Sequence, residues 1–196
     1  MRSRMGDVRR TTRETDVRVA VRLDGAGEAR VRTGLGFFDH MLELLARNAA
    51  IDLLVEAEGD LQIDEHHTVE DVGLALGEAL DRALGERRGI RRYGFWVPMD
   101  EALARVVIDL SGRNFVVFEA EFTRERVGEL PTELVEDFVR ALADRLRATI
   151  HVDILRGRND HHTIEALFKA LGRALRAAAE HDERFADRVP STKGVL

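Results

Sequence analysis

The chain has 196 residues, of which 44% are hydrophobic and 34% charged, and its formal net charge is −6 at pH 7. This length accommodates one large domain or two small ones of about 100 residues each, and the acidic balance argues against nucleic acid as a partner. The lack of cysteine excludes disulfides and thiolate ligands and fits a reducing cytoplasm, and the lack of any apolar run near about 18 residues argues against membrane association through a spanning helix.

The first half of the chain predicts strands around one helix. Alternating apolar residues from Val17 to Leu23 indicate a half-exposed strand, and a turn at 24–27 joins it to residues 29–33 in what we interpret as a β-hairpin. Apolar residues recur through 37–46 and predict a buried helix, with His40 near its start. Residues 51–56 alternate as a strand, and residues 61–63 are expected to form a short strand after a turn at Gly59.

A helix from His66 onward carries the first of two matching histidine pairs. Residues 64–80 and 159–175, at a constant offset of 95, are identical at nine of 17 positions: both histidines, Thr68, Glu70, Ala75, Leu76, Gly77, Ala79 and Leu80. Random pairing would give roughly one identity, so we interpret the chain as a duplicated unit. In a helix, His66 and Glu70 are close enough to share an ion, whereas the neighbours His66 and His67 diverge by about 100°.

Imidazole and carboxylate at this spacing predict metal binding. The repeat supplies a second set, His161 with Glu165 and His162 beside it, so that pairing of the halves about a pseudo-twofold axis could build two similar sites. The ligand mix suits Mn, Fe, Zn, Co or Ni. Surface histidines without a function are the alternative for one pair, but two pairs at matching positions favour ligands.

The second half repeats the order of the first. Residues 106–110 and 115–120 are interpreted as a hairpin, residues 133–148 as an amphipathic helix and residues 150–155 as a strand that leads through Gly157 into the second histidine helix. A last helix is expected to end near Asp187. Because no linker rich in Pro, Gly or Ser separates the halves, we expect a single compact domain of residues 1–196, with halves of about 1–90 and 91–196.

The tail at 190–194, with the sequence PSTKG, has the hydroxyl, ammonium and backbone donors that can bind a phosphate. Lysine occurs only at Lys169 and Lys193, so arginine should meet most of any bound anion.

Taken in order, the motifs of this chain resemble those of the imidazoleglycerol-phosphate dehydratase family of histidine biosynthesis over essentially the full length. They are RTTRET at 10–15, GFFDHML at 36–42, EHHTVED at 65–71, RRYG at 91–94, PMDEA at 98–102, DLSGR at 109–113, NDHHTIE at 159–165 and PSTKG at 190–194. One departure is Asn48, where the family pattern usually has a histidine.

The resemblance implies an α+β fold, internally duplicated, in which each half is a mostly antiparallel sheet with helices packed on one face, of the ribosomal protein S5 domain 2-like type. It also implies two Mn²⁺ ions per subunit and a cytoplasmic homo-oligomer of 24 subunits with active sites between subunits.

Carried over residue by residue, the resemblance implies a set of site residues. The metal ligands are His40, His66, His67, Glu70, His151, His161, His162 and Glu165. Glu14 corresponds to the acid/base candidate, and Glu70 and Glu165 join it in the catalytic set. The residues that contact the phosphorylated imidazole substrate are Glu14, His40, His66, Arg92, Arg113, His161, Ser191 and Lys193.

The reaction so implied is loss of water from D-erythro-imidazole glycerol phosphate to give imidazole acetol phosphate. The proton to be removed lies on a carbon with no adjacent carbonyl, so an enolate cannot stabilise the charge. A metal-bound imidazole ring can take the electrons, as an imidazolate and a diazafulvene-like intermediate. Two alternatives remain open: a binuclear metal phosphoesterase explains the ligands and basic residues equally well, and a metal-storage protein leaves Arg92, Arg113 and Lys193 without a role.

Overall fold

The computed structural model describes residues 4–93, 96–186 and 188–196. The elements in chain order are β1 (Met5–Thr11), β2 (Thr15–Arg22), β3 (Ala29–Arg32), α1 (Gly36–Ala49), β4 (Asp52–Gly59), α2 (His66–Leu84), β5 (Trp96–Met99), β6 (Ala102–Asp109), β7 (Phe115–Glu119), β8 (Arg126–Val127), β9 (Leu130–Pro131), α3 (Leu134–Leu146), β10 (Thr149–Arg156), α4 (Asp160–Ala179) and a short 3₁₀ helix, η1 (Glu183–Phe185). In the described part of the chain, no helix combines the length and the apolar character needed to cross a membrane.

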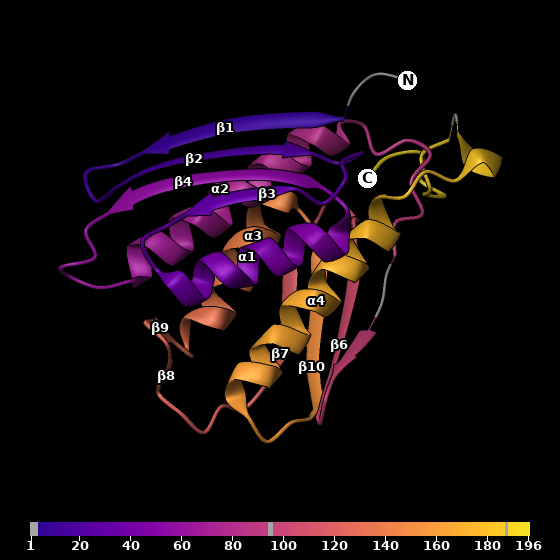
Figure 1. Cartoon of the computed structure of the whole chain (residues 1–196). Helices are drawn as coiled ribbons and strands as arrows, with labels where there is room; N and C mark the ends of the chain where they lie inside the picture. Colours follow the sequence, from indigo (N-terminus) through magenta and orange to yellow (C-terminus); the bar gives the residue numbers. More distant parts are fainter. Residues whose placement is uncertain (1–3, 94–95, 187) are drawn as a thin grey trace.

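Each half of the chain forms a four-stranded sheet, and the two sheets have the same strand order (Figure 1). The first is ordered β1-β2-β4-β3 and the second β5-β6-β10-β7. In both sheets the last strand runs parallel to its neighbour, and the other pairs are antiparallel. The fold is therefore α+β and internally duplicated, with mostly antiparallel sheets, as expected.

Both predicted hairpins are wrong, and for the same reason. β4 lies between β2 and β3, so β3 pairs in parallel with β4 and never meets β2. In the second half β10 lies between β6 and β7 in the same way. β2 pairs antiparallel with β1 and β4, and β6 with β5 and β10; the sequence pattern did not reveal these pairings.

Two smaller expectations are also corrected. Residues 61–63 form a turn and not a strand, because the chain must reverse between β4 and α2. The last long helix ends at Ala179, and only η1 follows before the tail, so no helix continues toward the expected end; Asp187 itself lies outside the described residues.

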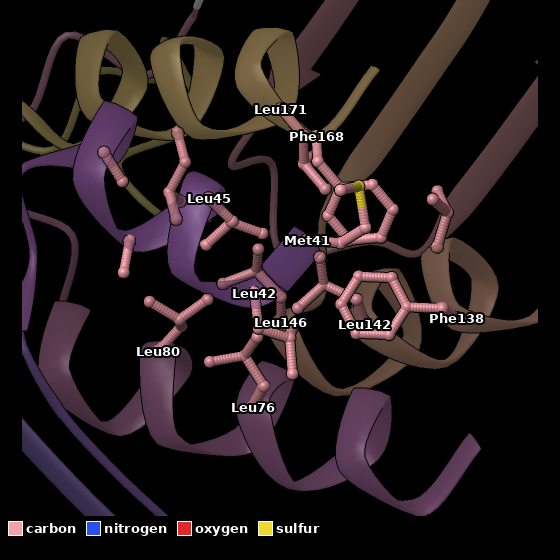
Figure 2. Close-up of a cluster of buried hydrophobic side chains, with 14 of the residues drawn as sticks. Met41, Leu42, Leu45, Leu76, Leu80, Phe138, Leu142, Leu146, Phe168 and Leu171 are labelled. Carbon is pink, nitrogen blue, oxygen red and sulfur yellow. The ribbon is translucent and has the colours of Figure 1, made fainter. Parts of the chain in front are cut away.

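The helices lie on one face of each sheet and meet in the middle of the molecule (Figure 1). α2 packs on β1 and β2, α4 packs on β5 and β6, and the halves join through the α2–α3 and α1–α4 contacts. Figure 2 shows the apolar side chains from all four helices that fill this junction. They include Met41, Leu42 and Leu45, Leu76 and Leu80, Phe138, Leu142 and Leu146, and Phe168 and Leu171. Burial of each such side chain contributes roughly 1.5–3 kcal/mol.

Two glycines at matching repeat positions allow these helices to cross closely. A Cβ atom at Gly77 of α2 would lie 2.5 Å from the carbonyl oxygen of Leu142 in α3, and one at Gly172 of α4 would lie 2.6 Å from that of Leu45 in α1. Both distances are far below van der Waals contact with backbone. The repeat therefore has glycine where the middle of each histidine helix crosses a helix of the other half.

Candidate functional site

The two histidine pairs open α2 and α4 with matching geometry. The rings of His66 and His67 are 6.2 Å apart between centroids at 86°, and those of His161 and His162 are 6.0 Å apart at 85°. Each pair thus presents two nearly perpendicular imidazoles, so the first and second histidines of a pair face different neighbours, as the helical spacing predicts.

The first histidine of α4 lies among other predicted residues. Nε2 of His161 is 3.4 Å from Oε2 of Glu165, its ring is 5.1 Å from that of Phe37 in α1, and Lys169 Nζ lies 2.6 Å from Oε1 of Glu165. Burial raises the pKa of Glu165, but the hydrogen bond from Lys169 and the charges of Lys169, His40 and His161 outweigh it, so the net pKa is lowered. His161 and Glu165 are therefore in contact, and His40 is near enough for its charge to act on the Glu165 carboxylate.

The first histidine of α2 faces a residue that the sequence did not single out. Nδ1 of His66 is 3.7 Å from Oδ2 of Asp137 on α3, and Glu70 is exposed one turn further along α2. Asp137 and His40 occupy equivalent positions, since each lies ten residues before the left-handed residue, Arg147 or Ala50, that ends its helix. This spacing could have identified Asp137 as a site residue, but only once α1 and α3 were known to be equivalent helices.

The second histidine of each pair contacts a carboxylate through Nδ1. In His67, Nδ1 is 3.1 Å from both oxygens of Asp60, and in His162 it is 2.9 Å from Oε2 of Glu101. The hydrogen bond to Asp60 raises the pKa of His67. The hydrogen bond between His162 and Glu101 likewise raises the pKa of His162, and it lowers the pKa of Glu101 to about 2. Neither Asp60 nor Glu101 was among the predicted site residues.

Glu14 lies in the turn between β1 and β2, close to the first histidine pair. It is exposed, and its Oε2 is 3.9 Å from Nε2 of His67. The turn is tied to α2 by the buried carboxylate of Asp71, which accepts hydrogen bonds from Thr15 Oγ1 at 2.5 Å and from Arg10 Nε at 2.7 Å. Glu14 is thus held beside His67 without a strong contact of its own.

The predicted anion-binding residues share one open hollow of about 850 Å³ at the end of the second sheet. Its walls bring Arg92, Arg113, Ser191 and Lys193 together, and Arg188 joins them as a further cation. Arg92 is half-buried, and its guanidinium joins two segments: it pairs with Asp109 and donates a hydrogen bond at 2.9 Å to the carbonyl oxygen of Pro190. This anchors the tail against β6 and leaves the other cations facing the hollow.

His151 is not brought to the other predicted ligands within one chain. It lies on the exposed face of β10, between the buried Ile150 and Val152, with its ring 6.5 Å from that of Phe115. More generally, no group of three or more His, Asp or Glu side chains within the described ranges is arranged to enclose a metal ion. A single chain therefore offers partial ligand sets of imidazole and carboxylate, a donor type that suits first-row divalent ions.

Comparisons with known proteins converge on one family. A family model described as imidazoleglycerol-phosphate dehydratase (IGPD) matches residues 33–175. The imidazoleglycerol-phosphate dehydratase of Halorhodospira halophila is 57% identical, covering 100% of both chains, and that of Hydrogenovibrio crunogenus is 54% identical, covering 98% of this chain and 100% of the relative.

Solved structures give the same result. The crystal structure of imidazoleglycerol-phosphate dehydratase from Staphylococcus aureus has a TM-score of 0.82 and 40% identity, covering 90% of this chain and 99% of that chain. The structure of IGPD from Pyrococcus furiosus in complex with (S)-C348 has a TM-score of 0.83 and 40% identity, covering 96% and 100%.

Proposed function

The chain belongs to the imidazoleglycerol-phosphate dehydratase family, hydro-lyases of histidine biosynthesis, and on this premise we propose that it converts D-erythro-imidazole glycerol phosphate to imidazole acetol phosphate with two Mn²⁺ ions per subunit. The observation that carries the metal-dependent part is the duplicated geometry of the histidine pairs. Each pair presents two nearly perpendicular imidazoles with a carboxylate nearby, so both helices offer the nitrogen and oxygen donors that a divalent ion takes.

The donors available fit two hard or borderline divalent ions. In one half His161 contacts Glu165, with His40 nearby, and in the other His66 faces Asp137, with Glu70 one turn further along α2. His67 and His162 are nearly perpendicular to the first histidine of each pair, so we assign them to different ions from those of His66 and His161. When bound, such ions would stabilise negative charge on the imidazole ring of the substrate. His151, on the outer face of β10, would reach a site only from a neighbouring copy.

Glu14 is the proposed proton-transfer group. Its carboxylate is exposed near Nε2 of His67 and makes no hydrogen bond in the described part of the chain that would hold it in one place. A general acid or base must reach the proton that it moves, and a carboxylate on a turn anchored by Asp71 has both access and a fixed base. Glu70 and Glu165 complete the catalytic set as ion-binding carboxylates.

The hollow beside the tail is the proposed phosphate site. Arg113, Ser191 and Lys193 provide guanidinium, hydroxyl and ammonium donors, and Arg92 holds the tail in place. Charge-assisted bonds to phosphate fix the far end of the substrate and so orient its reacting carbons.

We further propose a cytoplasmic 24-subunit assembly whose active sites lie between subunits. The partial ligand sets of one chain support sharing between copies. The outer face of the second sheet supports extensive self-association, because Trp96, Val107 and Phe115 are exposed there.

The test is incubation of Mn-loaded protein with imidazole glycerol phosphate. We expect the keto phosphate product with the phosphate ester intact. Release of inorganic phosphate instead would identify a binuclear phosphoesterase, and two bound ions without turnover would identify a storage protein.

A further inference from the structure

Each histidine pair has one ring held by a carboxylate that comes from outside the histidine helix. Asp60, just after β4, faces Nδ1 of His67, and Glu101, in the turn between β5 and β6, faces Nδ1 of His162. These two carboxylates have no part in the function proposed above. Their equal placement on the same nitrogen of equivalent rings indicates that the contact serves the histidines themselves.

Glu101 occupies the same position in its half of the chain as Glu14 does in the other half. Glu101 immediately precedes β6, as Glu14 immediately precedes β2, so the two glutamates occupy equivalent turns of the duplicated sheets. Glu14 is free near His67, but Glu101 is held at two points: Oε2 contacts His162, and Oε1 accepts the backbone N–H of Asn159 at 3.1 Å. In the described residues, the duplicated position thus has a carboxylate without a hydrogen bond in one half and one with two hydrogen-bond partners in the other.

A fixed carboxylate matters here because packing alone does not orient the rings. The side chains of His162 and Glu101 are 31% and 32% exposed, and a hollow of about 360 Å³ lies beside them. A neutral imidazole that donates from Nδ1 to a carboxylate must keep its lone pair on Nε2. Such a bond also fixes the ring and increases its basicity, which is how partners of metal-binding histidines act.

We propose that Glu101 is a positioning residue that fixes the tautomer and orientation of His162 so that Nε2 faces a bound divalent ion, and that Asp60 does the same for His67. The proposal rests on the metal sites of the proposed function. It adds that this chain supplies each site with one orienting carboxylate from a different structural element, the end of β4 in one half and the β5–β6 turn in the other.

The test is Mn²⁺ binding, measured by equilibrium dialysis and calorimetric titration of the full-length protein. Wild type should bind two ions per chain. Glu101→Ala should weaken one of the two sites by roughly 10-fold to 100-fold and leave the other within about threefold. Glu101→Gln keeps an acceptor but loses the charge, so about a tenfold loss at the same site is expected. Glu86→Ala, which removes an exposed carboxylate just beyond the C-terminal end of α2, at the opposite end of that helix from its histidine pair, is the control and should change neither site.

The site selectivity separates positioning from a general structural role, which would weaken both sites together and lower the melting temperature of the metal-free chain. Wild-type affinity at both sites in Glu101→Ala would overturn the inference; if that variant does not fold, wild-type affinity in Glu101→Gln would do so. Failure of wild type to bind two ions would count against the proposed function, whereas normal wild type with unaffected variants counts against this inference alone.

Discussion

The carboxylate of Asp71 joins the turn that carries Glu14 to the helix that carries the first histidine pair, and its removal should be costly. Asp71 is 5% exposed and accepts hydrogen bonds from Thr15 Oγ1 and Arg10 Nε. Asp71→Ala leaves the hydroxyl of Thr15, which is 4% exposed, without this partner, at a cost of about 1–3 kcal/mol. Arg10 is 37% exposed, so water replaces most of its lost bond and adds at most about 1 kcal/mol.

We therefore expect Asp71→Ala to lower the free energy of unfolding by about 1–4 kcal/mol, with Asp71→Asn intermediate because its amide oxygen can still accept from Thr15. Since Thr15 adjoins Glu14, kcat should fall more than KM rises. Urea unfolding of metal-free protein at one fixed protein concentration measures the first effect, and steady-state turnover of the Mn-loaded protein measures the second.

Asp7→Ala provides a control, because it removes an exposed carboxylate from β1, the strand beside the one that carries Thr15. Asp7 pairs with Arg18 at 3.0 Å, and both side chains are about half exposed, so this loss should stay below about 1 kcal/mol. If Asp71→Ala were no more destabilising than Asp7→Ala, the reasoning that the buried carboxylate holds the turn would be refuted.

Four further outcomes follow. Glu14→Gln should retain two Mn²⁺ ions, by elemental analysis, but lower kcat by roughly 100-fold or more. Lys193→Ala should raise KM by roughly 10-fold to 150-fold, because a charge-assisted phosphate contact contributes about 1.5–3 kcal/mol; an unchanged KM would locate the phosphate elsewhere. Asp137→Ala should weaken Mn²⁺ binding at one site only, measured by dialysis. In metal-free protein, the contact between His162 and Glu101 raises the pKa of His162 above its ordinary 6.5 and lowers the pKa of Glu101 from 4.5 to about 2. The contact therefore stabilises the fold fully between about pH 4.5 and pH 6.5, and this stabilisation is lost as the pH rises through the raised pKa of His162. The melting temperature of wild type should accordingly exceed that of Glu101→Gln more at about pH 5.5 than at about pH 8.5.

The sequence predicted the helices and the duplication well because both depend on local or repeated patterns. Helical periodicity depends on residues a few positions apart, and the offset of 95 residues between His66 and His161 is found by aligning the sequence with itself. The strand pairing could not be read in this way. β2 and β3 are adjacent in sequence and separated by a short turn, which favours a hairpin, but β4, which lies much later in the sequence, pairs with both and separates them.

The residues around the histidines were missed for a related reason. Asp137 lies on an amphipathic helix among other charged residues, so its pattern is that of a solvent-facing side chain. Only the pairing of α2 with α3 brings it to His66, and only the turn before β6 brings Glu101 to His162. Residues that contact the histidines from other elements are brought there by the tertiary structure, so they need not belong to a sequence motif.

The duplication separates what the scaffold requires from what the chemistry requires. Both halves keep the histidine pair, the close glycine crossing and the turn glutamate, so these belong to the shared framework. The halves differ in what surrounds it: His40 in one half corresponds to Asp137 in the other, and Lys169, which pairs with Glu165, has the apolar Leu74 as its counterpart near Glu70. The two turn glutamates are the sharpest comparison, because Glu14→Gln and Glu101→Gln make the same chemical change at equivalent backbone positions. Any difference between them must then arise from the contacts of each carboxylate, one free beside an imidazole and one bonded to it, and turnover and ion affinity are the two quantities that should separate.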